Sequence, residues 1–435
     1  MGAGVHAGFA RMTANLPSRL DILVAQRATL APLQWFAILI GFSVPISVAF
    51  DNLLLALVLL GALFSLGSLS RIVKVHPIAR AAMLLFALLS VAMFHGATPL
   101  KEAFAILAKY IDLMFVPIFI FLLSDAALRC KARYGFLFAM VITLAISYLV
   151  GSKILPVMSW MNIGAESGNP VIFHSHITQN NMMAFAAFLA LLELRDAATT
   201  LKRLAWGLFA LLASINVLFM VQGRTGYLIL LILLGWVAWS SFARYRHQQG
   251  KTWGWRQGTF ILLAFMAAAT LAYHTSARLH DRLGLVVSEY QAWTPNHGKT
   301  TSTGQRLDFY YNTLQIVREH PLFGVGTGGL EAAFAQQTQG KDVLQTPNPH
   351  NEYLMITAQT GLVGLALLLY LFYTQWRYAP LLPTTLEQDA ARGLVLAYML
   401  NCLFNSALLD HADGLFFAFM TAVFFAGLKK ETQHA

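Results

Sequence analysis

The feature that most restricts this chain is a series of apolar runs, each long enough to cross a bilayer. A hydrocarbon core of about 30 Å needs roughly 20 helical residues, and lipid leaves unpaired backbone groups without partners, so only helices or closed barrels span it. Because the runs do not alternate in polarity, they favour helices. We expect an all-α polytopic membrane protein with about 12 transmembrane helices. They lie near residues 33–49, 52–69, 79–95, 104–123, 134–155, 180–194, 203–221, 226–242, 257–273, 352–375, 390–408 and 412–428.

Composition and charge agree with this class. The 435 residues are 57% hydrophobic and 11% charged, whereas a soluble domain carries about 25% charged residues. The net charge of +10 suggests nucleic acid, but the basic residues gather in short clusters between apolar runs, as membrane topology requires. We therefore expect membrane lipids, and no nucleic acid, as partners. The first run begins near Leu33 and is followed at once by a second, which predicts an uncleaved span.

The distribution of lysine and arginine predicts the orientation. With a cytoplasmic N-terminus, 20 of them fall in cytoplasmic segments and 4 in the opposite short loops, while the other 6 lie in one long loop where the positive-inside rule does not apply. The chain then divides into helices 1–9 (residues 1–273, cytoplasmic N-terminus), a non-cytoplasmic loop subdomain between spans 9 and 10 (274–351), and helices 10–12 (352–435, cytoplasmic C-terminus).

The long loop contains a helical pattern. Apolar residues follow a 3.6-residue period from Arg306 to Val317, and Ser302 or Thr303 is the expected cap. A packed helix beside a Gly/Pro-rich turn indicates a small subdomain. A water-facing lid of this kind suits an enzyme that acts on external substrates.

Two arginines are candidates for binding phosphate. Arg224, in Q-G-R-T-G-Y-L, is the one charge at a short turn between two spans. It is either an interfacial anchor or a guanidinium held at headgroup depth for bidentate phosphate binding. Arg306 is expected in the first turn of the loop helix, where a basic residue is locally unfavourable unless an anion binds there. The alternative is a solvated loop arginine.

His350, in T-P-N-P-H-N-E-Y-L, is the candidate base. Pro347 and Pro349 stiffen its approach to the tenth span. A neutral histidine at this boundary can accept a proton from a hydroxyl near neutral pH. It can equally be a helix-start residue with no chemical role.

Other signals are weaker. Gly324, Gly326 and Gly329 spell G-x-G-x-x-G without a preceding strand, so a dinucleotide cofactor is not expected. His174 and His176 lack a nearby acidic or cysteine partner in sequence, so no metal is expected. Cys130 and Cys402 form no C-x-x-C and predict no disulfide. Lys109, an intramembrane charge, remains a secondary candidate, although Asp112 at helical spacing can neutralise it.

Taken together, these residues resemble the O-antigen ligase and polymerase superfamily of membrane glycosyltransferases. R-x-x-x-L is present as Arg224 to Leu228, and H-[NSQ]-x9-G-x-x-[GTY] as His350-Asn351, Gly361 and Gly364. An arginine ahead of a helix ending in H-P-L-F-G-V-G-T-G-G is present as Arg306 and residues 320–329. These motifs cover roughly residues 220–365, and the predicted number of spans matches the family over the whole chain.

The resemblance implies about 12 helices with a periplasmic loop between spans 9 and 10, in the cell inner membrane. It implies that a glycan on undecaprenyl pyrophosphate is transferred to a sugar hydroxyl of lipid A–core, with an active site facing the periplasm. The residues suit metal-independent, inverting transfer, with Arg224 and Arg306 on the pyrophosphate and His350 on the acceptor proton. Asn351 is a secondary candidate.

Three alternatives stay open. An O-antigen polymerase shares the donor but uses a second lipid-linked glycan as acceptor. A protein O-oligosaccharyltransferase usually carries a further C-terminal region, so the end of this chain soon after Lys430 favours the ligase. A lipid-linked glycan flippase would need polar groups along a path through the bilayer centre, whereas here they gather on one side.

Overall fold

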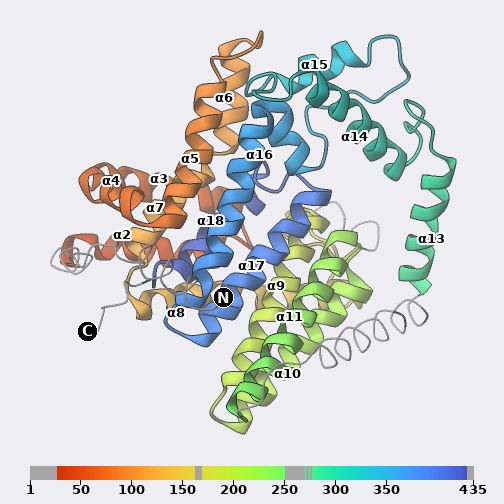
Figure 1. Cartoon of the computed structure of the whole chain (residues 1–435). Coiled ribbons are helices and arrows are strands. Elements are labelled where there is room, and N and C mark those ends of the chain that lie inside the picture. Colours follow the sequence, from red (N-terminus) through yellow and green to blue (C-terminus); the bar gives the residue numbers. More distant parts are fainter. Residues whose placement is uncertain (1–26, 162–168, 250–269, 271–273, 275–276, 429–435) are drawn as a thin grey trace.

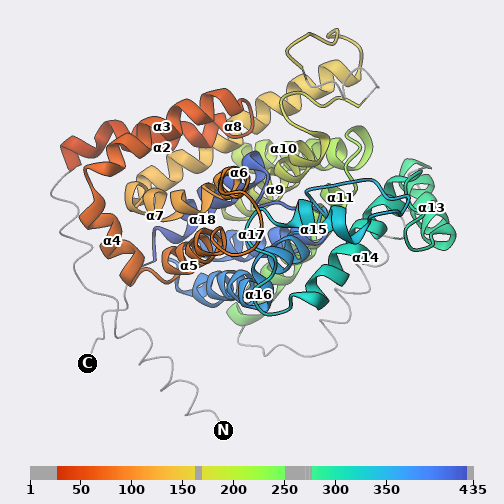
Figure 2. The same ribbon diagram turned by 90° about the horizontal axis from the view of Figure 1, so that it is seen from above.

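The computed structural model describes residues 27–161, 169–249, 270, 274 and 277–428, and it contains helices and no strand within those residues (Figures 1 and 2). The all-α prediction is therefore confirmed for the described part of the chain. The helices are α2 (Arg27–Ser43), α3 (Val48–Leu63), α4 (Leu66–Val75), α5 (Pro77–Ala92), α6 (Leu100–Lys109), α7 (Asp112–Leu122), α8 (Ala126–Gly151), α9 (His176–Asp196), α10 (Thr200–Ile215), η3 (Asn216–Met220), α11 (Arg224–Gln248), α13 (Ala277–Ala292), α14 (Ser302–Glu319), α15 (Leu330–Gln337), α16 (Glu352–Tyr378), η4 (Ala379–Leu381), α17 (Thr385–Phe404) and α18 (His411–Phe425).

The chain is a multi-pass membrane protein, but 12 spans are not confirmed. Six helices in the described ranges are long and apolar enough to cross a membrane, and a seventh crossing requires α3 and α4, bent by 95°, to act as one span. The predicted run 257–273 lies outside the described residues apart from Thr270. Several other runs are too short: α18 has 15 residues, about 22 Å at 1.5 Å per residue.

The centre of the bundle is formed by α9, α17 and α18. In α18 every residue from Ala412 to Phe425 is buried, and a helix that is apolar on all sides is surrounded by protein. The rings of Phe416 and Phe185 of α9 meet edge to face, with their centroids 5.6 Å apart. The ring centroids of Tyr398 of α17 and Phe417 lie 4.7 Å apart. Helices α7, α8, α10, α11 and α16 pack against these three helices.

The long helix α16 is broken at Gly361, which has φ 68° and ψ −165°. The break exposes two backbone carbonyls, and a glycine-rich loop after α14 pairs with both of them. Val325 N donates to Ala358 O at 2.9 Å, and Gly326 N donates to Gln359 O at 3.0 Å. The G-x-G-x-x-G segment thus joins the loop after α14 to the break in α16 through backbone hydrogen bonds. Its glycines are required because a Cβ at Gly324 would lie 2.4 Å from Ala358 O.

We predict that Gly361→Ala destabilises the protein. This φ/ψ combination is open essentially to glycine alone, and strain of this kind costs about 1–3 kcal/mol. The new Cβ would also lie 2.1 Å from the backbone of Leu322. The melting temperature of the detergent-solubilised protein, followed by size-exclusion chromatography, should fall by several degrees. Gly207→Ala in α10 is the control, because its nearest neighbour is 3.9 Å away. Equal melting temperatures for the two variants would contradict the prediction.

Candidate functional site where α11, α14 and α16 meet

Helix α14 carries one side of the candidate site and lies beyond the ends of α16 and α17 (Figure 1). Its N-cap is Thr301, whose hydroxyl accepts from Gly304 N at 3.0 Å, so the predicted cap at Ser302 or Thr303 is wrong. The helix begins at Ser302, which places Arg306 in the second turn and not in the first. The expected dipole penalty at Arg306 therefore does not apply, because that effect fades within the first turn.

Two amides at the start of α14, those of Thr303 and Gly304, already donate to side chains. Thr303 N donates to a carboxylate oxygen of Glu289 in α13 at 3.2 Å, beside the Thr301 cap. Fewer amides at this helix end are therefore open to an anion, and the combination of the helix end with the Arg306 guanidinium stays a prediction.

A buried carboxylate fastens the preceding turn to α14. Asp308 is 1% exposed. It accepts hydrogen bonds from Trp293 Nε1 at 2.9 Å, Asn296 N at 2.8 Å and Gly298 N at 2.7 Å. Because hydrogen bonds to a charged acceptor are the strong ones, Asp308 fixes the shape of the segment that leads into α14.

Arg224 approaches α14 from the bundle. It is the first residue of α11 and follows the π-helical turn η3 closely. Its Nη1 lies 3.5 Å from Thr303 Oγ1, across 79 residues of sequence, and its side chain is half-buried. Sequence spacing gives no hint of this contact.

His350 lies against the same helix at Phe309, six residues after the Thr303 that Arg224 contacts. Its ring stacks on the ring of Phe309, with the centroids 6.2 Å apart and an interplanar angle of 27°. Its backbone carbonyl accepts a hydrogen bond from Tyr310 Oη at 3.2 Å. Its amide donates to Asn348 Oδ1 at 2.8 Å. Burial lowers the pKa of His350 below its usual range, and the positive charge of Arg306 lowers it further. The imidazole is therefore held neutral at neutral pH.

The three predicted residues converge on one face of α14. Thr303, Arg306 and Phe309 follow one another at intervals of three, which places them on the same side of a helix. Thr303 contacts Arg224, and Phe309 contacts His350. Within the described ranges, no carboxylate forms an ion pair with the half-buried Arg306. The face thus presents guanidinium groups beside a neutral imidazole; the roles of these residues remain predictions.

The secondary candidates lie in other surroundings. Asn351 is the N-cap of α16: its Oδ1 accepts from Leu354 N at 2.9 Å, and its Nδ2 donates to Leu403 O at 3.0 Å. Lys109 is exposed at the end of α6. Its predicted pairing with Asp112 is wrong, because the helix is interrupted at Tyr110 and Ile111, between α6 and α7. Asp112 instead bonds His411 Nδ1 at 3.1 Å.

Neither histidine of the H-x-H segment joins this site. His174 Nε2 lies 2.7 Å from Val44 O, and His176 begins α9. The described residues contain no group of three or more His, Cys, Asp or Glu side chains that could hold a metal ion. His174 therefore connects the loop before α9 to the end of α2.

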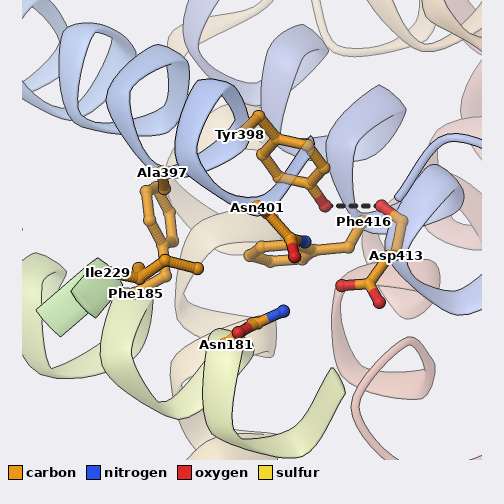
Figure 3. Close-up of a pocket in the computed structure, with 8 residues that line it drawn as sticks. All are labelled: Asn181, Phe185, Ile229, Ala397, Tyr398, Asn401, Asp413 and Phe416. Atoms are coloured by element: carbon orange, nitrogen blue, oxygen red, sulfur yellow. Dashed lines mark hydrogen bonds between the residues drawn. The ribbon is translucent and has the colours of Figure 1, made fainter. Parts of the chain in front are cut away.

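A small pocket lies deeper in the bundle, between α9, α11, α17 and α18. Asn181, Asn401 and Asp413 point into the same space in Figure 3. The cavity measures about 10 Å³, which is close to what one water molecule needs, so it is far too small for a sugar. Its lining is Asn181, Phe185, Ile229, Ala397, Tyr398, Asn401, Asp413 and Phe416.

Sequence reasoning missed several polar residues around the site, namely Asn348, Glu352, Asn405 and Ser406. Glu352 is fully buried and accepts from Tyr110 Oη at 2.9 Å and Leu408 N at 2.8 Å. These bonds join the start of α16 to the turn between α6 and α7 and to the linker before α18. An acidic residue directly after His350-Asn351 was a usable signal. Nothing in the local pattern marks Asn405 or Ser406.

Comparison with known proteins supports a family for the segment that contains this site. Residues 209–369 match a family model described as O-Antigen ligase, and this segment contains Arg224, Arg306, His350 and both glycine motifs. The chain is also similar to an uncharacterized protein of Haemophilus influenzae, with 28% identity over 119 residues, 26% of this chain and 30% of the relative. It therefore spans about a third of that relative's length. The resemblance to the O-antigen ligase and polymerase superfamily is confirmed over residues 209–369.

We predict that Asp308→Ala loosens the segment before α14. Three donors lose a charged acceptor, each bond being worth about 1.5–3 kcal/mol. Limited proteolysis of the purified protein should cut near residues 293–298 much faster than in the parent. Asp342→Ala is the matched control, because its pair with Lys299 is exposed on both sides and exposed pairs contribute little. Equal cleavage rates in the two variants would count against the assignment.

Proposed function

We propose that this protein is an O-antigen ligase. It transfers a glycan from undecaprenyl pyrophosphate to a sugar hydroxyl of lipid A–core at the periplasmic face of the inner membrane. The observation that carries the proposal is the convergence of Arg224, Arg306 and His350 on one face of α14, inside the segment that matches the family.

In this proposal, Arg224 and Arg306 bind the pyrophosphate. The lipid pyrophosphate gains negative charge as it leaves, and cationic donors already in place stabilise that charge without reorganisation. A guanidinium suits this role because its fork matches phosphate geometry. Arg306 has no carboxylate partner in the described ranges, so its charge is available to an incoming anion.

His350 accepts the proton of the acceptor hydroxyl. The acceptor oxygen forms a bond to the anomeric carbon while the bond from that carbon to the phosphate oxygen breaks. The electron pair leaves with the pyrophosphate, and the proton passes to the imidazole. Direct displacement inverts the anomeric centre. The lowered pKa of His350 suits this role because it keeps the ring unprotonated.

We predict that a strain deleted for this gene and carrying His350→Ala shows bare core in its lipopolysaccharide pattern, while polymer accumulates on the lipid carrier. Loss of a general base costs about 10²–10⁴-fold in rate. Arg224→Ala and Arg306→Ala should each cost about 10²–10³-fold. Arg318→Ala, at an exposed position on the same helix, is the control.

The lipopolysaccharide patterns of these strains, seen by gel electrophoresis, also distinguish the alternative functions. Core bearing a single repeat unit in the deletion strain would make the protein a polymerase. An unchanged ladder in the deletion strain would reject both activities. A normal ladder in the His350→Ala strain would reject the histidine as base and leave the acceptor assignment intact.

We predict a pH effect on transfer by the purified enzyme. The activity should fall as the pH drops through the lowered pKa of His350, because protonation removes the base. Arg306→Gln removes a positive charge that lowers this pKa, so the pKa rises and the acid limb of kcat/KM moves to higher pH. Arg306→Lys keeps the charge and should leave the limb in place. An acid limb that does not respond to the charge at this position would exclude His350 as the titrating group.

A further inference from the structure

The linker between α17 and α18 contacts both sides of the candidate site. It begins at Asn405, the extended residue that ends α17, and continues through Ser406, which is 4% exposed. No motif singled out in the sequence includes it. Its polar side chains nevertheless bond to Thr225, which follows Arg224, and to Asn348, two residues before His350.

On one side, the linker is connected to the start of α11. Asn405 Nδ2 lies 3.2 Å from Thr225 Oγ1, and it also donates to Asn401 Oδ1 at 2.8 Å. Thr225 is buried and follows Arg224 directly. The position of Asn405 therefore bears on where the backbone of Arg224 lies.

On the other side, the linker holds the backbone of His350. Ser406 Oγ donates to Asn348 Oδ1 at 2.7 Å, and the same oxygen accepts from His350 N at 2.8 Å. His350 has φ 54°, a left-handed conformation that costs a residue other than glycine roughly 1–3 kcal/mol. Asn348 thus stabilises a strained backbone, and Ser406 fixes the direction in which Asn348 points.

We propose that Ser406 and Asn405 are positioning residues for glycan transfer: through Asn348 and Thr225, one short linker sets the distance between the His350 imidazole and the Arg224 guanidinium. This inference rests on the proposed function. Transfer needs the base and the leaving group on opposite sides of one carbon, and a displacement of about 1 Å can cost 10²-fold in rate. A buried linker that bonds to both elements limits such displacement.

Bonds that do not involve the Ser406 hydroxyl also hold this linker. Leu408 N, further along the same linker, bonds Glu352 at 2.8 Å, and Asp410 caps α18 through Ala412 N at 3.1 Å. Neither contact involves Ser406 or Asn348. Removal of the hydroxyl should therefore act on the site while α17 and α18 stay in place.

The test is steady-state kinetics of purified Ser406→Ala with lipid-linked glycan and lipid A–core. We expect kcat to fall about 10- to 100-fold with little change in KM. The acid limb should move to higher pH, because a loosened His350 is less buried. Ser406→Thr keeps a hydroxyl and should recover most of the rate. Asn405→Ala should instead raise the KM for the lipid-linked donor and leave the acid limb unchanged.

The matched control is Thr421→Val, which removes a buried hydroxyl that accepts from Gln375 Nε2 at 2.8 Å within the bundle. Similar kinetics in Ser406→Ala and Thr421→Val would overturn the inference while leaving the proposed function intact. The proposed function itself fails separately, if the purified parent protein transfers no glycan from the lipid-linked donor to lipid A–core.

A double-mutant cycle guards against a folding defect in Ser406→Ala. If Ser406 acts through Asn348, adding Ser406→Ala to Asn348→Ala should cause almost no further loss of kcat. Additive losses would overturn the inference, because the two side chains would then act independently.

Discussion

The structure depends on one constraint: a helix broken within a membrane protein must find partners for the backbone groups that the break exposes. The break at Gly361 in α16 meets it through the loop that follows α14, whose amides pair with Ala358 O and Gln359 O. Leu362 N completes the junction by donating to Pro321 O at 2.8 Å. Because Pro321 lies two residues beyond the end of α14, this junction anchors one end of that helix to the bundle.

The anchor explains how residues far apart in sequence meet. One end of α14 is joined to α16 at the break, and the other end reaches the start of α11 at Arg224. The face between these two contacts carries Arg306 and packs against His350. The family's glycine motifs are thus explained by backbone packing, and through that packing they set the register of the side chains proposed to perform the chemistry.

The charged side chains have different partners at the two ends of the bundle. At the far ends of α8, α9, α11 and α17, buried acids pair with arginines: Arg129 with Glu387, and both Arg195 and Arg244 with Asp389. At the α14 end, Asp308 accepts from backbone amides, and no carboxylate in the described ranges pairs with Arg306. In the proposed function, such an ion pair would cancel the field that Arg306 offers to a pyrophosphate.

Sequence alone determined the class of this protein, because apolar runs report directly that most of the chain does not face water. It located helices at each predicted run within the described ranges, and it selected Arg224, Arg306 and His350 from their motifs. It misplaced the cap of α14 and paired Lys109 with Asp112. Its count of 12 spans is not confirmed, since six helices in the described ranges are long and apolar enough to cross a membrane. Only the tertiary structure decided that Arg224 meets Thr303, that Asn351 is a helix cap, and that Ser406 bonds to Asn348 beside His350. The physical reason is that hydrophobic periodicity is a local property of the chain, whereas these contacts join distant segments whose approach is fixed by helix packing and by the pairing of broken backbone.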